Sequence, residues 1–287
     1  MWYSKYLQAF EQPCESVSDS IKQEIANKIK TFNNNDNPLC SIVAIAHNEE
    51  RHILGCLWSI VDNICNFPIE IIVVNNNSSD STESLLKAIG VKYFNESRQS
   101  PGYARQCGLD NAHGKYHMCI DADTLYPPHY IETHVKYLSM GYICTYSLWS
   151  FLPDKKHSRL NLKLYESFRD LYLLLQNINR PELVVRGMTL SFVANEGKKV
   201  KYRTHIIRGE DGMMALGLKK KGKLKMIISR KTRAITSNTT LNKNGSLARN
   251  ALLRIKKALK NFKLLFTSQS EYKDRDDNII DKNKNNT

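Results

Sequence analysis

Hydrophobic and polar positions along residues 39–125 alternate in the way expected of strands joined by short helices. Apolar, β-branched runs predict strands, and apolar residues at three- and four-residue steps predict helices between them. The expected strands are 39–46, 69–74, 91–95 and 116–120, and the expected helices are 49–61, 81–89 and 102–112. This alternation predicts an α/β fold with a mainly parallel sheet and helices on both faces.

The segments on either side of this core show other patterns. A polar helix is expected over 16–32 and an Asn-rich connector over 31–38, so residues 1–38 are interpreted as an N-terminal helical extension and linker. The catalytic domain is expected over 39–240. Beyond the fourth strand we expect a helix at 130–140, an apolar stretch at 142–152, a long helix at 158–178 and short strands around 183–194.

The long helix at 158–178 has an apolar stripe that we expect to face the core, because stripes at helical spacing usually pack inward. The stripe is formed by Leu160, Leu164, Phe168, Leu171 and Leu175.

Charge is distributed unevenly along the 287 residues. Residues 1–197 carry 18 Lys and Arg against 21 Asp and Glu, whereas residues 198–233 carry 13 basic and 2 acidic residues. Residues 234–266 add 7 basic residues and no acid, and the whole chain has a net charge of +14. A near-neutral domain followed by a cationic third indicates a polyanionic neighbour: a membrane surface, a phosphate-bearing ligand or nucleic acid.

Cysteine usage and hydropathy restrict the class of protein. The seven Cys are scattered without a C-x-x-C pair, which favours reduced thiols over a disulfide framework or a zinc site. Residues 1–10 lack the apolar core of a secretion signal, and no run of about 18 apolar residues occurs. We therefore expect a cytoplasmic protein that is soluble or lies on a membrane.

Two carboxylates one residue apart, Asp121 and Asp123, follow the expected strand 116–120. Ligands of parallel α/β sheets bind beyond the carboxyl ends of the strands. Oxygen ligands in small number suit Mg²⁺ or Mn²⁺ that already holds phosphates. An isolated D-x-D also occurs in surface turns, so it is the position at a strand end that favours a cation site.

A second acidic pair, Glu210 and Asp211, lies between two glycines and before an apolar run. Acids at a helix start are favoured by the helix dipole, and a carboxylate placed there can also serve as a general base. Two arginines, Arg98 and Arg105, precede Asp121, and either could bind a diphosphate or simply cover a helix face.

Six short motifs follow one another between about residues 39 and 235. They are AHNEE at 46–50, VVNNNSSDST at 73–82, GYARQCG at 102–108, GKY at 114–116 leading to DAD at 121–123, RGMT at 186–189 and GED at 209–211. Their order and spacing resemble those of the inverting glycosyltransferases of family two, which have the Rossmann-like GT-A fold. Each motif is weak alone, and the series is specific.

The resemblance implies a nucleotide pocket lined by the backbone near Ala46 and by Glu49. Asn75 and Asn76 stand where the family usually has Asp, which reads the base edge. Asn both donates and accepts hydrogen bonds whereas ionised Asp only accepts them, so the resemblance does not define the nucleotide. Arg105 matches the family's basic residue beside the nucleotide.

The resemblance also implies roles for the carboxylates. Asp123 would bind the metal, Mn²⁺ or Mg²⁺, that bridges the donor diphosphate, and Asp121 would contact the ribose or the metal. Asp211 would be the general base, with Glu210 orienting it. Gly187 and the residues up to 189 would border the donor sugar and the acceptor.

The cationic segment after the catalytic domain is expected to form a basic amphipathic helix over 241–266, with Ser246 as its N-cap. An apolar stripe with a cationic remainder fits a helix that lies on anionic lipid through 246–266, and a helix packed on the domain is the alternative. Residues 267–287 are expected to be disordered.

These observations predict a metal-dependent inverting glycosyltransferase of the hexosyltransferase type. It would transfer a sugar from a nucleotide-diphosphate donor to a hydroxyl of a surface glycan, which is expected to be lipid-linked, at the inner face of a bacterial membrane. One alternative is a sugar nucleotidyltransferase, which would need a Gly-rich phosphate loop that 47–50 does not offer. The other is a nucleic-acid-binding protein, which would need aromatic residues among the basic ones, yet 198–233 contains only Tyr202. We therefore expect no nucleic-acid partner.

Overall fold

The computed structural model describes residues 1–33, 37–238 and 278–280. Its strands are β1 (Cys40–Ala46), β2 (Ile69–Asn75), β3 (Lys92–Asn95), β4 (Tyr116–Asp121), β5 (Thr124–Leu125), β6 (Cys144–Ser147), β7 (Trp149–Phe151), β8 (Leu190–Val193), β9 (Leu224–Ile227) and β10 (Ala234–Thr236). Its α-helices are α1 (Asp19–Phe32), α2 (Ile53–Val61), α3 (Thr82–Ile89), α4 (Pro101–Asp110), α5 (Tyr130–Ser139), α6 (Arg159–Asn179), α7 (Ala194–Val200) and α8 (Glu210–Lys219). Short 3₁₀ helices are η1 (Ser4–Gln8), η2 (Cys14–Ser16), η3 (Pro181–Leu183), η4 (Gly187–Thr189) and η5 (Arg230–Thr232).

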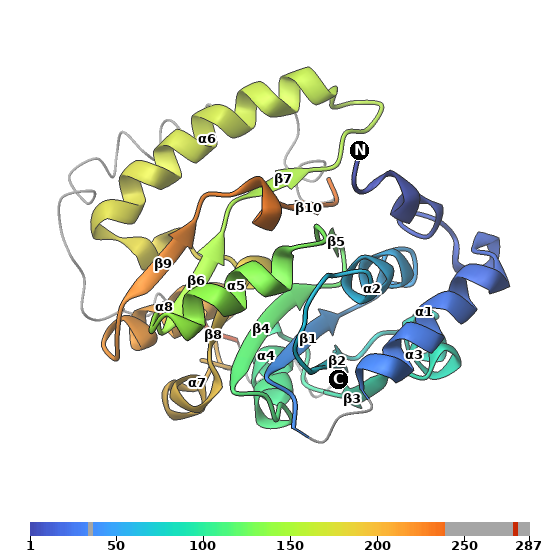
Figure 1. The fold of residues 1–287 in the computed structure, drawn as a ribbon, viewed down its shortest axis with the longest axis horizontal. Coiled ribbons are helices and arrows are strands. Elements are labelled where there is room, and N and C mark those ends of the chain that lie inside the picture. The colour runs from blue at the N-terminus through green and yellow to red at the C-terminus, as the bar shows by residue number, and fades with distance from the viewer. Residues whose placement is uncertain (34–36, 239–277, 281–287) are drawn as a thin grey trace.

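The strands form two sheets (Figure 1). The larger has the order β3-β2-β1-β4-β8-β6-β9, and the smaller has the order β5-β10-β7. In the larger sheet β1 pairs in parallel with β2 and β4, β2 with β3, and β6 with β9. The exception is β8, which runs antiparallel to β4 and β6. The predicted α/β class and mainly parallel sheet are confirmed.

Helices cover both faces of the larger sheet because its central strands are apolar on both sides. Ile42 and Ala44 of β1 belong to the core cluster that contains α2, whereas Val43 belongs to a separate cluster with Ala104 of α4. Side chains of a strand alternate between its faces. A strand covered on both faces is therefore mostly apolar, as the run at 39–46 is.

The N-terminal segment contributes to the same core as the sheet. Tyr6 and Phe10 are buried, and so are Ile25 and Ile29 of α1. They belong to one hydrophobic cluster with residues of α2. Residues 1–33 thus pack on the α/β domain along the side where α1 and α2 lie together in Figure 1.

The apolar stripe of the long helix does not face the core, so that prediction is wrong. The side of α6 that packs inward carries Leu162, Glu166, Arg169 and Leu173, all of which are buried. Glu166 accepts a hydrogen bond of 2.7 Å from the backbone N–H of Phe151 in β7, which fixes the helix by a polar contact. Periodicity shows which side chains share a face, but a buried polar anchor decided which face is inside.

The C-terminal predictions are answered only in part. Asn278 and Ile280 bond through their backbone to Ile207 and His205, and Ile279 forms a β-bridge with Ile206. The expected disorder of 267–287 is therefore incorrect for residues 278–280. The predicted basic helix over 241–266 and the rest of the predicted tail lie outside the described residues.

All seven cysteines are described, and each is a free thiol, as predicted. Among the described residues there is no helix that is both long and apolar enough to cross a membrane.

Candidate active site

The predicted site residues meet where three parallel strands end. Ala46, at the end of β1, is paired with Asn75 at the end of β2, and the neighbouring Ile45 is paired with Asp121 at the end of β4. The backbone N–H of Asn76 donates to the carbonyl of Ala46 at 2.8 Å. Register thus places the first, second and fourth strand ends side by side, as the α/β pattern predicts.

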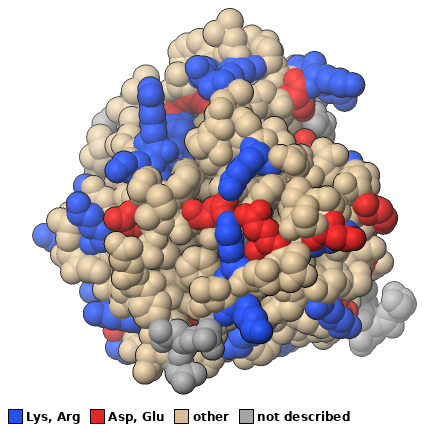
Figure 2. Space-filling model, turned by 45° about the vertical axis from the view of Figure 1, so that its right-hand side comes forward, with Lys and Arg blue, Asp and Glu red and all other residues tan. Residues whose placement is uncertain are grey.

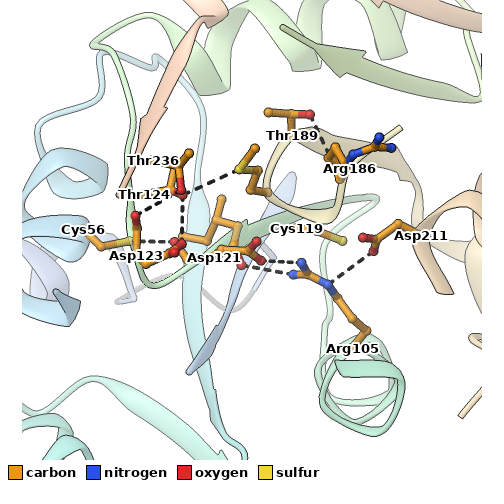
Figure 3. A network of polar contacts seen from close by, with 12 residues as sticks. Cys56, Arg105, Cys119, Asp121, Asp123, Thr124, Arg186, Thr189, Asp211 and Thr236 are labelled. Atoms are coloured by element: carbon orange, nitrogen blue, oxygen red, sulfur yellow. Dashed lines mark hydrogen bonds and ion pairs between the residues drawn. The ribbon is translucent and has the colours of Figure 1, made fainter. Parts of the chain in front are cut away.

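Arg105 connects two of the carboxylates (Figure 3). It projects from α4, is 2% exposed, and donates from Nη1 to the carbonyl of Ile120 at 3.0 Å. Its Nη2 forms an ion pair with Asp121 Oδ1, and its Nε lies 3.5 Å from Asp211 Oδ1. A buried guanidinium needs compensating charge, and here two acids from different elements supply it.

Asp211 and Glu210 open α8. Gly209, just before them, has φ +96°, a left-handed conformation that favours glycine. Burial is the main cause that raises the pKa of Asp211, while Arg105 opposes the shift and Asp121 adds to it. Burial, followed by the charge of Asp211, raises the pKa of Glu210 to about 7. Glu210 can therefore accept a proton near neutral pH, and Asp211 accepts one at a higher pH than an ordinary Asp does.

Gly187 in η4 passes directly over the Arg105–Asp211 contact. A Cβ at this position would lie 2.6 Å from Asp211 Oδ2 and closer still to Arg105 Nη2. The backbone of Gly187 also hydrogen-bonds to Asp211, which lowers the pKa of that carboxyl. Only a residue without a side chain fits here.

Replacing Gly187 with Ala should therefore displace the Arg105 guanidinium. We expect at least about a tenfold loss of turnover, because misplacing a positioned group by about 1 Å can cost up to a hundredfold. The measurement is kcat beside the control Gly90→Ala, where the would-be Cβ has nothing within 4 Å and the φ of +68° costs stability without a clash at the site. Equal kcat in both variants would show that the close approach at Gly187 has no part in the activity.

Asp123 lies beyond β4 and is held by the segment after β10. Its Oδ2 accepts a hydrogen bond of 3.1 Å from Ser237 Oγ, and its backbone carbonyl accepts one of 3.0 Å from the Ser237 N–H. Burial, with repulsion from Asp121 and then Glu49, raises the pKa of Asp123 to about 7. The carboxylates outweigh the opposing charge of His52, so the site favours either a proton or a cation.

The donor set fits a hard divalent cation. Asp121 and Asp123 offer carboxylate oxygens, which Mg²⁺ and Mn²⁺ prefer. In the described part of the chain no group of three or more His, Cys, Asp or Glu is arranged to hold a metal by itself. One or two carboxylates completed by substrate phosphates is the usual arrangement for Mg²⁺.

Asn75 and Asn76, two of the predicted nucleotide-pocket residues, make different side-chain hydrogen bonds. The side-chain amide of Asn76 donates to the carbonyls of Glu96 and Arg98 at 3.0 and 2.9 Å, so its N–H groups hold that loop. Asn75 donates to Asn95 at 2.8 Å, while its own Oδ1 has no hydrogen-bonding partner among the described residues. Asn75 therefore has a buried acceptor to spare.

Arg98 and Arg105 make different contacts. Arg98 forms an ion pair of 2.7 Å with Glu96 and lies over the ring of Tyr103, with its side chain 62% exposed. Arg105 alone of the two reaches Asp121. It reaches that carboxylate as a buried bridge rather than as an open phosphate ligand.

Sequence reasoning missed three side chains that support the site. Tyr126 Oη accepts the backbone N–H of Asp121 at 2.9 Å and donates to the carbonyl of Met188 at 3.1 Å, which ties β4 to η4. His52 lies 2.7 Å from Glu49, and Ser237 holds Asp123. No motif marks Ser237, because it reaches the site only through the pairing of β10 with β5.

Acidic side chains gather on the face seen in Figure 2, where they form a band across the middle with Lys and Arg above and below. On this face the surface is therefore of mixed sign.

Comparison with known proteins bears on the family and the fold of the chain. The family model described as Glycosyl transferase family 2 matches residues 41–197, more than half of the chain. An uncharacterized glycosyltransferase of Rickettsia prowazekii, RP339, is 29% identical over 143 residues, covering 44% of this chain and 45% of the relative. The chain spans about half of the length of the curated relatives it matches.

Solved structures are similar in fold. The mannosyltransferase PcManGT from Pyrobaculum calidifontis, in complex with GDP-Man and Mn²⁺, aligns with a TM-score of 0.54 at 16% identity, over 80% of this chain and 68% of that one. Glucosyl-3-phosphoglycerate synthase from Mycobacterium tuberculosis, in complex with Mn²⁺, UDP-glucose and phosphoglyceric acid, aligns with a TM-score of 0.51 at 18% identity, over 79% and 81%. The expected GT-A fold is confirmed.

Proposed function

The chain belongs to glycosyl transferase family 2, and from that premise we propose that it transfers a sugar from a nucleotide-diphosphate donor to a hydroxyl of a lipid-linked glycan, with inversion and with a divalent metal. The observation that carries the proposal is the Arg105 bridge between Asp121, at a strand end, and Asp211, at a helix start. It fixes a donor-side carboxylate and a candidate base relative to one another.

Asp211 is the proposed general base. Its raised pKa makes its carboxylate a stronger proton acceptor than an ordinary Asp, and Arg105 fixes its position. The acceptor hydroxyl would give its proton to Asp211 as its oxygen attacks the anomeric carbon from the side opposite the diphosphate. One such displacement inverts the anomeric centre. Glu210 is the proposed residue that orients Asp211. Burial and the charge of Asp211 raise the pKa of Glu210 to about 7.

Asp123 and Asp121 are the proposed holders of Mn²⁺ or Mg²⁺. A divalent cation bound there supplies a Lewis acid that stabilises the negative charge of the departing diphosphate. Asp123 is suited to the task because burial and the negative charges of Asp121 and Glu49 outweigh the effect of His52. Structures of similar fold contain Mn²⁺ with a nucleotide sugar, which supports the choice of cofactor.

The proposed nucleotide pocket is formed by Ala46, Glu49, Asn75 and Asn76 beside Arg105. Asn75 Oδ1 is the acceptor available to a base edge. Proteins of similar fold are seen with GDP-Man in one case and UDP-glucose in another, so the base is left open. On the acceptor side, a lipid-linked glycan at the cytoplasmic face of a membrane, with the segment 246–266 on anionic lipid, remains our proposal from charge and resemblance.

The proposal is tested by a donor screen. Purified protein is incubated with individual nucleoside-diphosphate sugars and Mn²⁺ or Mg²⁺, and release of nucleoside diphosphate is measured. We expect release from one donor, its loss with EDTA, and its loss in Asp123→Asn, while Asp110→Asn at the exposed end of α4 behaves as wild type. Release that persists undiminished in EDTA would rule out the metal-dependent reaction.

A further inference from the structure

The outer face of α6 carries six large apolar side chains that no described residue covers. They follow one another at steps of four, four, three, four and three residues, so they form one straight stripe along the helix. Their exposed fractions are 76% for Leu160, 60% for Leu164, 68% for Phe168, 57% for Leu171, 50% for Leu175 and 73% for Ile178. Single exposed apolar residues are ordinary, but a continuous stripe marks a surface that meets another partner.

This stripe has no part in stabilising the fold. The opposite side of α6 already packs inward through Leu162, Glu166, Arg169 and Leu173. The guanidinium of Arg169 lies 4.4 Å from the centre of the Trp149 ring, which closes the contact with β7. The helix is thus anchored without the stripe. In Figure 1 it runs along the edge of the molecule with β7 beneath it.

The exposed charges beside the N-terminal end of the stripe are positive. Lys155, Lys156, Arg159 and Lys163 are exposed on the helix and on the loop that precedes it. The acids of the helix are engaged elsewhere: Glu166 is buried against β7, and Asp170 is paired with Arg169 and Arg233. The exposed surface of α6 therefore contains apolar and basic residues and no acid.

We infer that the outer face of α6 lies on the surface of an anionic lipid bilayer. A helix with one apolar face, basic flanks and moderate overall hydropathy lies in the plane of the interface, with its apolar side chains among the acyl chains and its Lys and Arg at the phosphates. No described helix is suited to crossing the bilayer.

Charge favours lipid over two alternative occupants of this face, the downstream segment of the chain and a second copy of α6. Residues 239–277 carry 9 basic and 4 acidic residues, so this segment has a net charge of the same sign as the basic residues beside α6. A second copy of α6 would bring a basic helix against another. Anionic lipid complements α6 and the downstream cationic segment together.

The inference rests on the proposed function and deepens it, because docking through α6 would hold the protein on the membrane that carries a lipid-linked acceptor. The chain continues from the end of α6 through η3 to Arg186 and Gly187, and Gly187 lies directly over the Arg105–Asp211 contact. Arg186 lies 5.6 Å from the centre of the Trp149 ring in β7, the strand on which α6 packs. Arg186 and α6 thus contact the same strand.

The test measures sedimentation of the full chain with vesicles, without donor or metal. The probe is a 1:1 mixture of phosphatidylcholine and phosphatidylglycerol, with vesicles of phosphatidylcholine alone as the comparison. The variant is Leu164→Gln with Phe168→Gln, and its matched control is Ile64→Gln with Met140→Gln, two exposed apolar residues outside α6. We expect binding to the mixed vesicles that weakens at least about tenfold in the α6 variant and not in the control.

Three outcomes would overturn the inference. One is equal vesicle binding by the α6 variant and its control. Another is a wild-type dimer that the α6 variant alone dissociates, which would assign the stripe to a second copy. The last is faster proteolysis of 239–277 in the α6 variant with vesicle binding intact, which would assign the stripe to that segment. Because the vesicle experiment contains no sugar donor, vesicle binding through α6 can be found even if the donor screen fails. Equally, the donor screen can succeed when no vesicle binding through α6 is found.

Discussion

Replacing Asp211 with Asn is expected to lower kcat by about 10²–10⁴-fold while leaving the affinity for the nucleotide-sugar donor unchanged. A positioned general base contributes on this order to a displacement by a hydroxyl. Asn keeps the shape of Asp but cannot accept the proton. The measurement is kcat at saturating donor and metal, beside donor affinity by titration.

The variant should still fold, because the single positive charge of Arg105 is contacted by two negatively charged carboxylates. Arg105 has both Asp121 and Asp211 as partners, so removing one carboxylate leaves a balanced pair. The loss in kcat can then be assigned to chemistry. The matched control is Asp110→Asn, an exposed carboxylate at the end of α4. Unchanged kcat in Asp211→Asn would remove Asp211 from the role of base.

The pH dependence gives a second measure of the same role. Burial raises the pKa of Asp211, and burial with Asp211 raises the pKa of Glu210 to about 7. A base must be deprotonated to act, so kcat should fall as the pH drops through the raised pKa values and level off above them. At saturating metal, the residual kcat of Asp211→Asn should show a weaker decline toward acid pH than wild type.

The fold could be predicted largely because its signals are local. The strands at 39–46, 69–74 and 116–120 are mostly apolar runs, each with one polar residue (Ser41, Glu70 and His117), and β1 and β2 are indeed covered on both faces. The antiparallel β8 and the small β5-β10-β7 sheet were not predicted, because short strands of two to four residues carry little pattern and their pairing is decided by distant segments.

The site was predictable to a different depth for each residue. The order of the motifs predicted that Asp121, Asp123 and Asp211 belong to one site, and in the structure Asp121 and Asp211 contact the same guanidinium, that of Arg105. Ser237 could not be found, since it supports Asp123 only through tertiary pairing. The outward stripe of α6 could not be found either, because Glu166 and Arg169 read as exposed in the sequence and are buried in the fold.

Replacing Arg105 with Gln is expected to cost the largest share of stability of any change at the site. Breaking a buried ion pair by removing one partner typically costs about 3–5 kcal/mol, since it leaves the other charge uncompensated. Here two carboxylates lose their cation, and the Ile120 carbonyl loses its donor. The measurement is the free energy of unfolding from urea denaturation.

Arg98→Gln is the matched control, because it removes the same side chain from an exposed ion pair. The Arg98 side chain is 62% exposed, and pairs of this kind contribute about 1 kcal/mol or less. Arg105→Lys should fall between the two, because a lysine keeps the charge but cannot bridge two carboxylates with a rigid fork. If Arg105→Gln fails to fold, Arg105→Lys still gives a measurable loss relative to Arg98→Lys.

The double variant of Arg105→Gln with Asp211→Asn separates the bridge from simple packing. If Arg105 acts by compensating charge, removing Asp211 as well leaves only Asp121, whose side chain is 33% exposed and can be hydrated. The double variant should then be more stable than the sum of the single losses indicates, and the difference is the coupling free energy of the pair. Strictly additive losses would mean that Arg105 stabilises the site through its volume alone, and the proposed link between the donor carboxylate and the base would have no electrostatic basis.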